Sequence, residues 1–134
     1  QLNIKKHLKI YGGKELFLKI EKSVNYGKDG CIFVYNGPVA IYDALPYCKL
    51  TNHPFPSHFS LQRESTATGM NPLNEITLIL EKKPKYIITH SPEEYGENKK
   101  VRYYLYDNII KNYTEIFNWT LSPKEGTYSV YKMK

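Results

Sequence analysis

Two short apolar runs constrain the fold of this chain more than any other feature. Residues 31–35 (Cys-Ile-Phe-Val-Tyr) contain no charged or amide side chain, and a second run at residues 86–89 follows Pro84. A strand whose apolar residues do not alternate with polar ones is usually covered on both faces, as the strands of parallel sheets are. Both runs are therefore predicted to be buried strands, with the second at the centre of a sheet.

Helical patterns lie on either side of these runs. Residues 14–25 place apolar side chains along one stripe of a helix. Residues 39–45 are compatible with a short helix. Residues 72–83 predict a longer one, because Asn71 is a good N-cap and Pro84 cannot continue the hydrogen-bond ladder.

The second half of the chain contains a further helix and a hairpin. Ser-Pro-Glu-Glu at residues 91–94 matches a capping box, so a helix is predicted from there to about residue 111. Residues 113–119 and 127–131 alternate in polarity and are separated by a turn, which predicts a β-hairpin. Residues 53–69 are rich in Pro, Ser and Thr and are expected to form an irregular loop that is functional or mobile.

The order of elements predicts an α/β fold. Helix, strand, helix, a short strand at residues 47–51, loop, helix, strand, helix and hairpin follow one another. Such alternation favours a mainly parallel sheet with helices on both faces and a C-terminal antiparallel hairpin at its edge. Residues 1–13 are expected to be a connector, and residues 14–134 a single α/β domain.

The charge is basic but dispersed. The formal net charge is +6, and only two of the 19 basic residues are arginine. Basic chains often bind nucleic acid, but arginine, which makes bidentate phosphate contacts, is scarce here and the lysines are scattered. No nucleic-acid partner is therefore predicted, whereas a position near anionic lipid headgroups fits the charge. No apolar run is long enough to span a bilayer, and the start at Gln1 predicts a piece of a longer chain.

The cysteines and two of the histidines do not predict a metal site. Cys31 and Cys48 are the two cysteines, and they form no CxxC motif. Cys31 is either a small buried side chain or, in an oxidising compartment, the partner of Cys48 in a disulfide. His53 and His58 flank Pro-Phe-Pro-Ser without a third ligand, which is typical of a loop rather than of a zinc site.

Candidate ligand contacts lie where the predicted strands end, because open parallel sheets bind ligands outside the carboxyl ends of their strands. Asn36 and Gly37 follow the first strand, and their N–H groups can hold an anion at a helix start. His90 follows the central strand and can transfer a proton or contact phosphate. The structural alternatives are a turn with a helix cap and a polar loop histidine. No catalytic residue and no cofactor is predicted, since dinucleotide and P-loop motifs are absent.

Tyrosine is unusually common, with 13 residues in the chain. Tyr103, Tyr104 and Tyr106 cannot all face the core of one helix, so at least one is expected to be exposed. Exposed aromatic side chains suit contacts with sugars, bases or proteins alike. The sequence therefore predicts a contact surface without identifying its partner.

Five segments resemble a known family. They are GCIFVYNGPVAIYDAL, PSHF, NEITLILEKKPKYIIT, IIKNYTEIF and GTYSVYKMK. Together they resemble the soluble C-terminal tail of polytopic membrane glycosyltransferases of the dolichyl-phosphate-mannose protein mannosyltransferase-like, GT-C type. The resemblance covers roughly residues 14–134. It departs from the family at His58, where arginine often precedes the phenylalanine.

The resemblance implies an extracytoplasmic domain that follows the last transmembrane helix, with residues 1–13 as the connector from that membrane region. It implies that the parent enzyme uses a polyprenyl-phosphate-linked sugar and that its catalytic carboxylate lies in the membrane part, so no catalytic residue is carried over here. The expected partners are the transmembrane region of the same chain, the lipid-linked sugar, the acceptor and the nearby membrane surface. Asn36, Gly37, His58 and His90 would be contacts, with residues 53–69 as a gate.

Two other classes of function remain open from the residues. One is a stand-alone small-ligand or nucleotide-binding α/β module. The other is a protein-interaction domain that uses the tyrosines.

Overall fold

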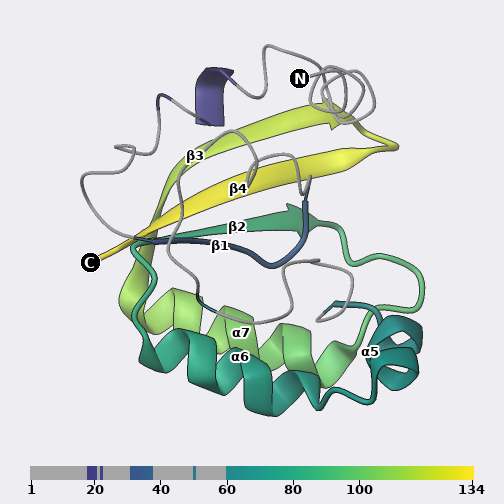
Figure 1. Cartoon of the computed structure of the whole chain (residues 1–134). Helices are drawn as coiled ribbons and strands as arrows, with labels where there is room; N and C mark the ends of the chain where they lie inside the picture. The colour runs from purple at the N-terminus through teal and green to yellow at the C-terminus, as the bar shows by residue number, and fades with distance from the viewer. Residues whose placement is uncertain (1–17, 21, 23–30, 38–49, 51–59) are drawn as a thin grey trace.

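The computed structural model describes residues 18–20, 22, 31–37, 50 and 60–134. The expected connector, the helix at residues 39–45 and most of the strand at 47–51 lie outside these residues. Residues 18–20 are helical, as the apolar stripe predicts. The elements of the described chain are β1 (Ile32–Val34), α5 (Gln62–Thr68), α6 (Pro72–Glu81), β2 (Tyr86–Ser91), α7 (Lys99–Asn112), β3 (Tyr113–Ser122) and β4 (Gly126–Met133) (Figure 1).

The sheet is mixed, so the expectation of a mainly parallel sheet is wrong. Its four strands lie in the order β1-β2-β4-β3. Only β1 and β2 are parallel, whereas β4 is antiparallel to both β2 and β3. The predicted hairpin is confirmed, but its second strand returns into the space beside β2 instead of extending the sheet edge. Strand β4 is therefore internal, and antiparallel pairing dominates.

The expectation of helices on both faces is also wrong: the long helices α6 and α7 share one face, and the described helical residues 18–20 contact the other through Ile20. Figure 1 shows α6 and α7 side by side on one face of the sheet. The strand order explains this arrangement: the chain passes from β1 through α5 and α6 to β2, and from β2 through α7 to β3. Both crossovers move in the same direction across the sheet. Crossovers of one handedness that do not reverse direction place their helices on the same face.

Both faces of the sheet are nevertheless buried, as the unbroken apolar run of β1 predicts. Phe33 points toward α6 and α7, whereas Ile32 and Val34 point to the other face. The core on the helix face is made of Phe33, Tyr35, Leu50, Ile76, Ile79, Ile87, Val101, Leu105, Ile109 and Tyr113. The core on the other face is made of Ile20, Ile32, Val34, Tyr86, Ile88, Tyr128 and Val130. Successive strand residues alternate between the two cores.

Strand β3 forms an edge of the described sheet and is irregular. Its pairing with β4 shifts register between Glu115 and Phe117 and again between Thr120 and Ser122. Ile116 is the extra residue of the first shift and is 40% exposed. A shift of this kind is a β-bulge, which bends and twists the strand that carries it.

The start of α6 agrees with the prediction from the sequence, whereas the start of α7 does not. The Asn71 side chain accepts a hydrogen bond from the Asn74 N–H at 3.2 Å, so the predicted cap of α6 is confirmed. The capping box predicted at residues 91–94 is wrong, because Ser91 still pairs with Thr127 in the sheet. Helix α7 begins only at Lys99 and is capped by the Asn98 side chain.

Helix α5 lies inside the segment that was expected to be an irregular loop. Its sequence, QRESTAT, has no apolar stripe, so hydrophobic periodicity gives no helical signal. Hydroxyl groups of Ser65 and Thr66 donate to the Gln62 carbonyl inside the helix. Gly69 ends the helix with a φ of 70°. The expectation for residues 53–59 lies outside the described chain.

Gly69 and Gly126 have similar backbone angles, but replacing them with alanine should destabilise the fold by different amounts. Gly69 has a φ of 70° and open space around it, whereas a Cβ on Gly126, at a φ of 87°, would collide with the Ser91 carbonyl oxygen. We expect Gly69→Ala to cost about 1 kcal/mol from backbone strain alone. Gly126→Ala should cost about 1–3 kcal/mol more, because a packed backbone must shift. Urea unfolding measures both free energies, and equal losses would contradict the close packing of the hairpin turn on β2.

The buried Tyr113 hydroxyl should make the stability of the fold sensitive to alkaline pH. This hydroxyl donates to the Pro84 carbonyl at 2.6 Å, and burial raises the pKa of Tyr113 from 10.0 to about 12. Because the folded pKa lies above the unfolded one, the neutral hydroxyl stabilises the fold below about pH 10, and this contribution is lost as the pH rises toward 12. Tyr113→Phe should lower the free energy of unfolding by about 1 kcal/mol at pH 7. Between pH 9 and 11 the free energy of unfolding of this variant should fall less than that of the wild type, because the variant has no hydroxyl to ionise.

Urea unfolding at several pH values tests this expectation. Tyr103→Phe is the matched control, because Tyr103 is exposed on α7. Parallel stability curves for the wild type and Tyr113→Phe would refute the role given to the Tyr113 hydroxyl.

Candidate functional site

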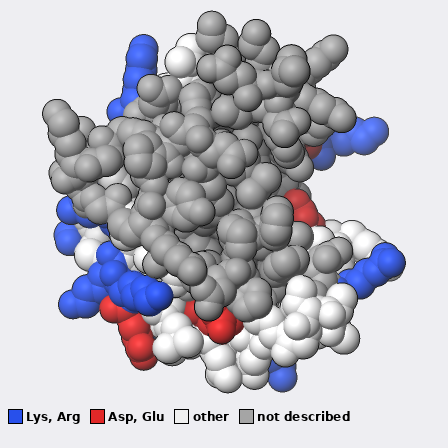
Figure 2. All heavy atoms as spheres, viewed as in Figure 1, with Lys and Arg blue, Asp and Glu red and all other residues white. Residues whose placement is uncertain are grey.

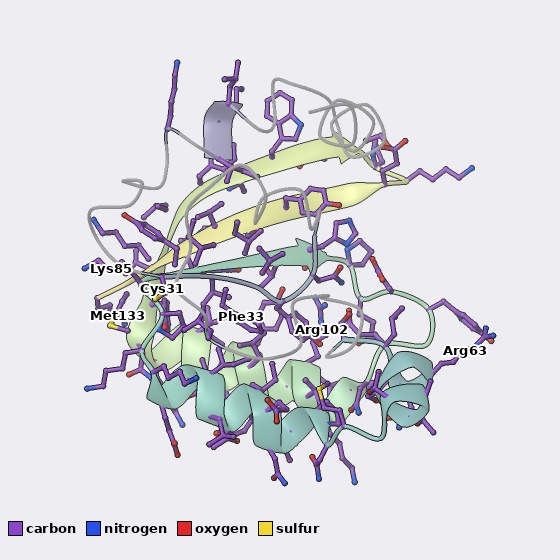
Figure 3. All side chains as sticks on the ribbon, viewed as in Figure 1. Cys31, Phe33, Arg63, Lys85, Arg102 and Met133 are labelled. Atoms are coloured by element: carbon purple, nitrogen blue, oxygen red, sulfur yellow. The ribbon has the colours of Figure 1, made fainter. Side chains whose placement is uncertain are left out.

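Polar side chains gather where β1 and β2 end. The two strands are parallel, so their carboxyl ends meet at the same edge of the sheet. Asn36 follows β1, His90 lies near the end of β2, and the loop after β2 brings Glu97 to the same edge. Figure 3 shows Arg102 of α7 reaching toward this region, at the opposite end of the sheet from Cys31 and Met133.

A buried ion pair is the centre of this cluster. Arg102 Nη1 lies 2.9 Å from Glu97 Oε2, and the Glu97 side chain is fully buried. Asn36 Nδ2 donates to the other carboxylate oxygen at 3.3 Å. A buried carboxylate without such donors would be strongly disfavoured. The predicted contact Asn36 is therefore engaged with Glu97.

Arg102 also donates to the end of β2 and to a residue of its own helix. Its guanidinium donates to the His90 carbonyl at 3.3 Å, to Ser91 Oγ at 3.1 Å and to the Tyr106 hydroxyl at 3.4 Å. Its Cζ also lies 4.7 Å from the centre of the Tyr106 ring. Burial disfavours the charged guanidinium, but Tyr106 and Glu97 outweigh this effect and raise the pKa of Arg102. Arg102 therefore stays charged and holds α7 against the end of β2.

Tyr35 places a buried hydroxyl beside the ion pair. Its side chain is fully buried, and the hydroxyl has no hydrogen-bond partner among the described residues. Burial and the Glu97 charge raise the pKa of Tyr35 far above its ordinary value of 10.0, although Arg102 acts in the opposite direction. Tyr35 is therefore neutral at any physiological pH.

His90 faces the other side of the sheet. Its Nε2 lies 2.6 Å from the Glu125 carbonyl oxygen, and its ring centre lies 4.8 Å from that of Tyr128. Its Nδ1 is buried and has no partner within the described chain. Gly37 packs against the same Tyr128 ring, since a Cβ there would lie 3.4 Å from it. His90 and Gly37 thus share Tyr128, whereas Asn36 belongs to the ion-pair cluster on the helix face.

The sequence identifies only part of this cluster. Asn36, Gly37 and His90 lie at the predicted end of the sheet, but His58 lies outside the described residues. Glu97 and Arg102 were missed, because Glu97 lies in a loop and Arg102 flanks the buried stripe of α7. A signal was present: Arg102 is one of only two arginines, next to buried Val101. In the described part of the chain, no group of three or more His, Cys, Asp or Glu could hold a metal ion.

The chemistry of the cluster is that of a structural network. The Glu97 carboxylate is neutralised by Arg102 and hydrogen-bonded by Asn36. The His90 ring is fixed by the Glu125 carbonyl and by Tyr128 rather than by a carboxylate partner. General acid–base catalysis needs a group that reaches a substrate with a pKa near the working pH. Here the charged groups, Glu97 and Arg102, bind each other and are not directed toward a substrate.

The cysteine at the other end of the sheet is oxidised. Cys31 precedes β1 and is disulfide-bonded. Cys48, the other cysteine of the sequence, lies outside the described residues. Of the two alternatives left open by the sequence, the disulfide is the one observed for Cys31.

Comparison with known proteins found no matching family model, no matching curated protein and no matching solved structure. No helix in the described part of the chain has both the length and the apolar character needed to cross a bilayer.

Removing Arg102 should destabilise the domain because it leaves the Glu97 carboxylate buried and uncompensated. We expect Arg102→Met to cost about 3–5 kcal/mol. The double variant Arg102→Met with Glu97→Met should lose less than the single variant, since no unpaired charge remains. Arg63, the other arginine of the chain, is exposed on α5, and Arg63→Met should change stability by less than about 0.5 kcal/mol. Chemical unfolding of these proteins and of the Glu97→Met single variant gives the comparison, and additive losses at residues 97 and 102 would exclude the coupling.

Proposed function

We propose that this chain is the extracytoplasmic C-terminal domain of an integral-membrane glycosyltransferase that uses a polyprenyl-phosphate-linked sugar. In this proposal the domain covers the membrane core of the parent enzyme and shapes access of the acceptor. The chemistry is carried out by the membrane part, and this domain supplies no catalytic residue. The proposal rests on the five segments that resemble this family of enzymes.

The disulfide at Cys31 is the observation that carries the extracytoplasmic location. Disulfides persist in oxidising compartments such as the periplasm and the cell exterior, and they are rare in the reducing cytosol. Cys31 begins the apolar run that forms β1, so the bond is attached to the core of the domain. A domain outside the cytoplasm is the simplest setting for such a bond.

The distribution of charge is consistent with a place beside a membrane. Figure 2 shows Lys and Arg side chains at several separate places on the described part of this face, with acidic groups beside some of them. Lysine side chains near anionic headgroups each gain about 1 kcal/mol of attraction. A dispersed positive surface fits an extended lipid plane better than it fits one compact polyanion.

The closed polar network supports a non-catalytic role. Glu97, Arg102 and Asn36 satisfy one another at the strand ends, where an open α/β sheet would normally bind its ligand. This observation weakens the alternative of a nucleotide-binding module at that edge.

A protein-interaction domain is the second candidate, and one observation favours it. Tyr103 is 68% exposed and Ile110 is 74% exposed on the outer side of α7. The prediction that one of the three clustered tyrosines is exposed is therefore confirmed. Seven residues separate Tyr103 and Ile110, which places them on one helix face. The membrane core of the parent enzyme would be one partner for such a face.

Glycosyl transfer by three proteins tests the proposal. The full polypeptide should transfer sugar from a polyprenyl-phosphate donor, the isolated 134-residue chain should show no turnover, and a parent lacking residues 14–134 should show a raised acceptor KM. Turnover by the isolated chain would refute the non-catalytic role. An upstream coding sequence without apolar segments of about 20 residues would refute the membrane assignment.

A further inference from the structure

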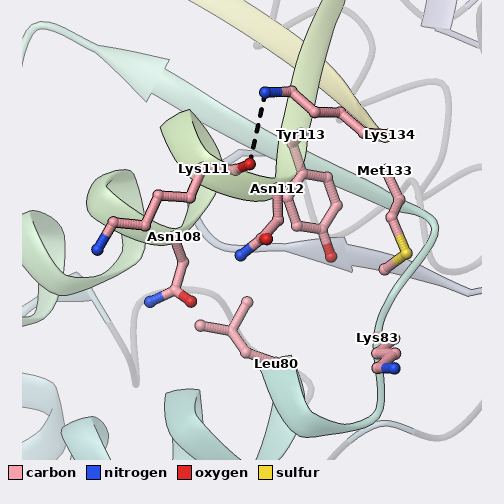
Figure 4. Close-up of a pocket in the computed structure, with 8 residues that line it drawn as sticks. All are labelled: Leu80, Lys83, Asn108, Lys111, Asn112, Tyr113, Met133 and Lys134. Atoms are coloured by element: carbon pink, nitrogen blue, oxygen red, sulfur yellow. Dashed lines mark hydrogen bonds between the residues drawn. The ribbon is translucent and has the colours of Figure 1, made fainter.

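A cavity lies at the opposite end of the sheet from the ion-pair cluster. Its volume is about 340 Å³, and it opens between the C-terminal ends of α6 and α7, the start of β3 and the end of β4 (Figure 4). Cavities of this size accommodate small organic ligands. None of the candidate contacts identified from the sequence lines it.

The inner wall of the cavity is apolar. Leu80 of α6, the Tyr113 ring and the Met133 side chain form this wall. The Tyr113 hydroxyl is already used by the Pro84 carbonyl, and burial raises the pKa of Tyr113 to about 12. The phenol is therefore neutral, and its ring presents an uncharged surface to any occupant.

The rim of the cavity is cationic. In Figure 4 Lys83 and Lys111 stand on opposite sides of the cavity, and Lys134 lies above it. Lys111 is paired with Asp107 at 2.8 Å, which raises the pKa of Lys111 but also offsets its charge. Lys134 Nζ donates weakly to the Lys111 carbonyl at 3.4 Å. Lys83 and Lys134 are thus the two rim cations without a carboxylate partner in the described chain.

The backbone at Lys83 adds an independent observation. Lys83 follows the C-cap of α6 and has a φ of 53°, and it is the one non-glycine residue of the described chain with a positive φ. Helices usually place glycine at this left-handed position, because a side chain there is strained. Strain of this kind is often retained where the side chain has a function. Here the strained position places an ammonium group at the rim of the cavity.

We propose that this cavity binds the phosphoryl head of an amphiphile, a phosphate monoester or diester carried on an apolar chain. The phosphate would lie between Lys83 and Lys134, with the side-chain amide of Asn112 as a further donor and Asn108 offering the N–H that is not used by the Tyr104 carbonyl. The first part of the apolar chain would pack on Leu80 and Met133. Lysine binds phosphate as a point charge, and the apolar wall distinguishes an amphiphile from a free anion.

This proposal does not rest on the proposed glycosyltransferase role, because the 134-residue chain itself is the object of the test. Dodecyl phosphate below its micelle concentration is the probe, and calorimetric titration gives its Kd. Inorganic phosphate tests whether the apolar wall contributes, and dodecyl maltoside tests whether the charge contributes. Both should bind at least tenfold more weakly than dodecyl phosphate.

The test variant is Lys83→Gly with Lys134→Gln. Glycine relieves the left-handed strain at residue 83, so the variant should remain folded. Its affinity for dodecyl phosphate should fall about tenfold or more, equivalent to about 1.4 kcal/mol. The matched control is Lys100→Gln with Lys124→Gln, which removes the same charge from exposed positions on α7 and in the β3–β4 turn. This control should stay within about twofold of the wild type.

Each remaining outcome contradicts the proposal. Equal losses in the two double variants would show that net charge rather than the cavity binds the probe. Inorganic phosphate binding as tightly as dodecyl phosphate would exclude the amphiphile. Absence of dodecyl phosphate binding to the wild type would exclude the site.

Discussion

The contact between Arg102 and Glu97 joins several separate elements of the described structure. It connects the loop after β2 to α7, and through Asn36 it also reaches the end of β1. The pair is buried, so its net contribution to stability is smaller than the cost of removing either partner. Its main effect is to fix the position of α7 relative to the sheet. Arg102 makes its hydrogen bonds to Glu97, His90 and Ser91 only when α7 lies in one position against the sheet.

The position of β4 determines the remaining architecture. The hairpin returns β4 between β2 and β3, so β2 and β3 run in the same direction with one strand between them. Both crossovers then place α6 and α7 on one face, which leaves the other face to Ile20 and its neighbours. One end of this sheet holds the ion-pair cluster, and the other end holds the cavity. The two ends therefore have different chemistry, the first with its charges paired internally and the second with lysines at its rim.

Much of the local structure could be predicted from this sequence, although the capping box at residues 91–94 was wrong and α5 was missed. Long-range pairing could not be predicted. The two buried strands, the cap at Asn71 and the hairpin follow from apolar runs, caps and turns, which are properties of neighbouring residues. Which strand pairs with β2 depends on residues far apart in the sequence, as in the pairing of Ile88 with Val130, 42 positions later. An unbroken apolar run indicates that both faces of a strand are covered, but it does not show that the neighbouring strands are parallel. Strand β4 is internal to the sheet and antiparallel to β2. Arg102 and Glu97 were missed because their pairing depends on how the loop after β2 folds onto α7, and the scarcity of arginine was the one signal in the sequence.

The bulged edge strand has a consequence for association between copies of this domain. An exposed edge offers unpaired N–H and C=O groups to any extended chain, which is a route to sheet-to-sheet aggregation. In the described sheet β3 is bonded to β4 on one side, and its two register shifts interrupt a regular template on the other. Glu115, exposed beside the first shift, would place a carboxylate against its own copy in any symmetric pairing there. The irregular edge therefore works against regular sheet-to-sheet pairing through β3, even where many copies are crowded onto one surface.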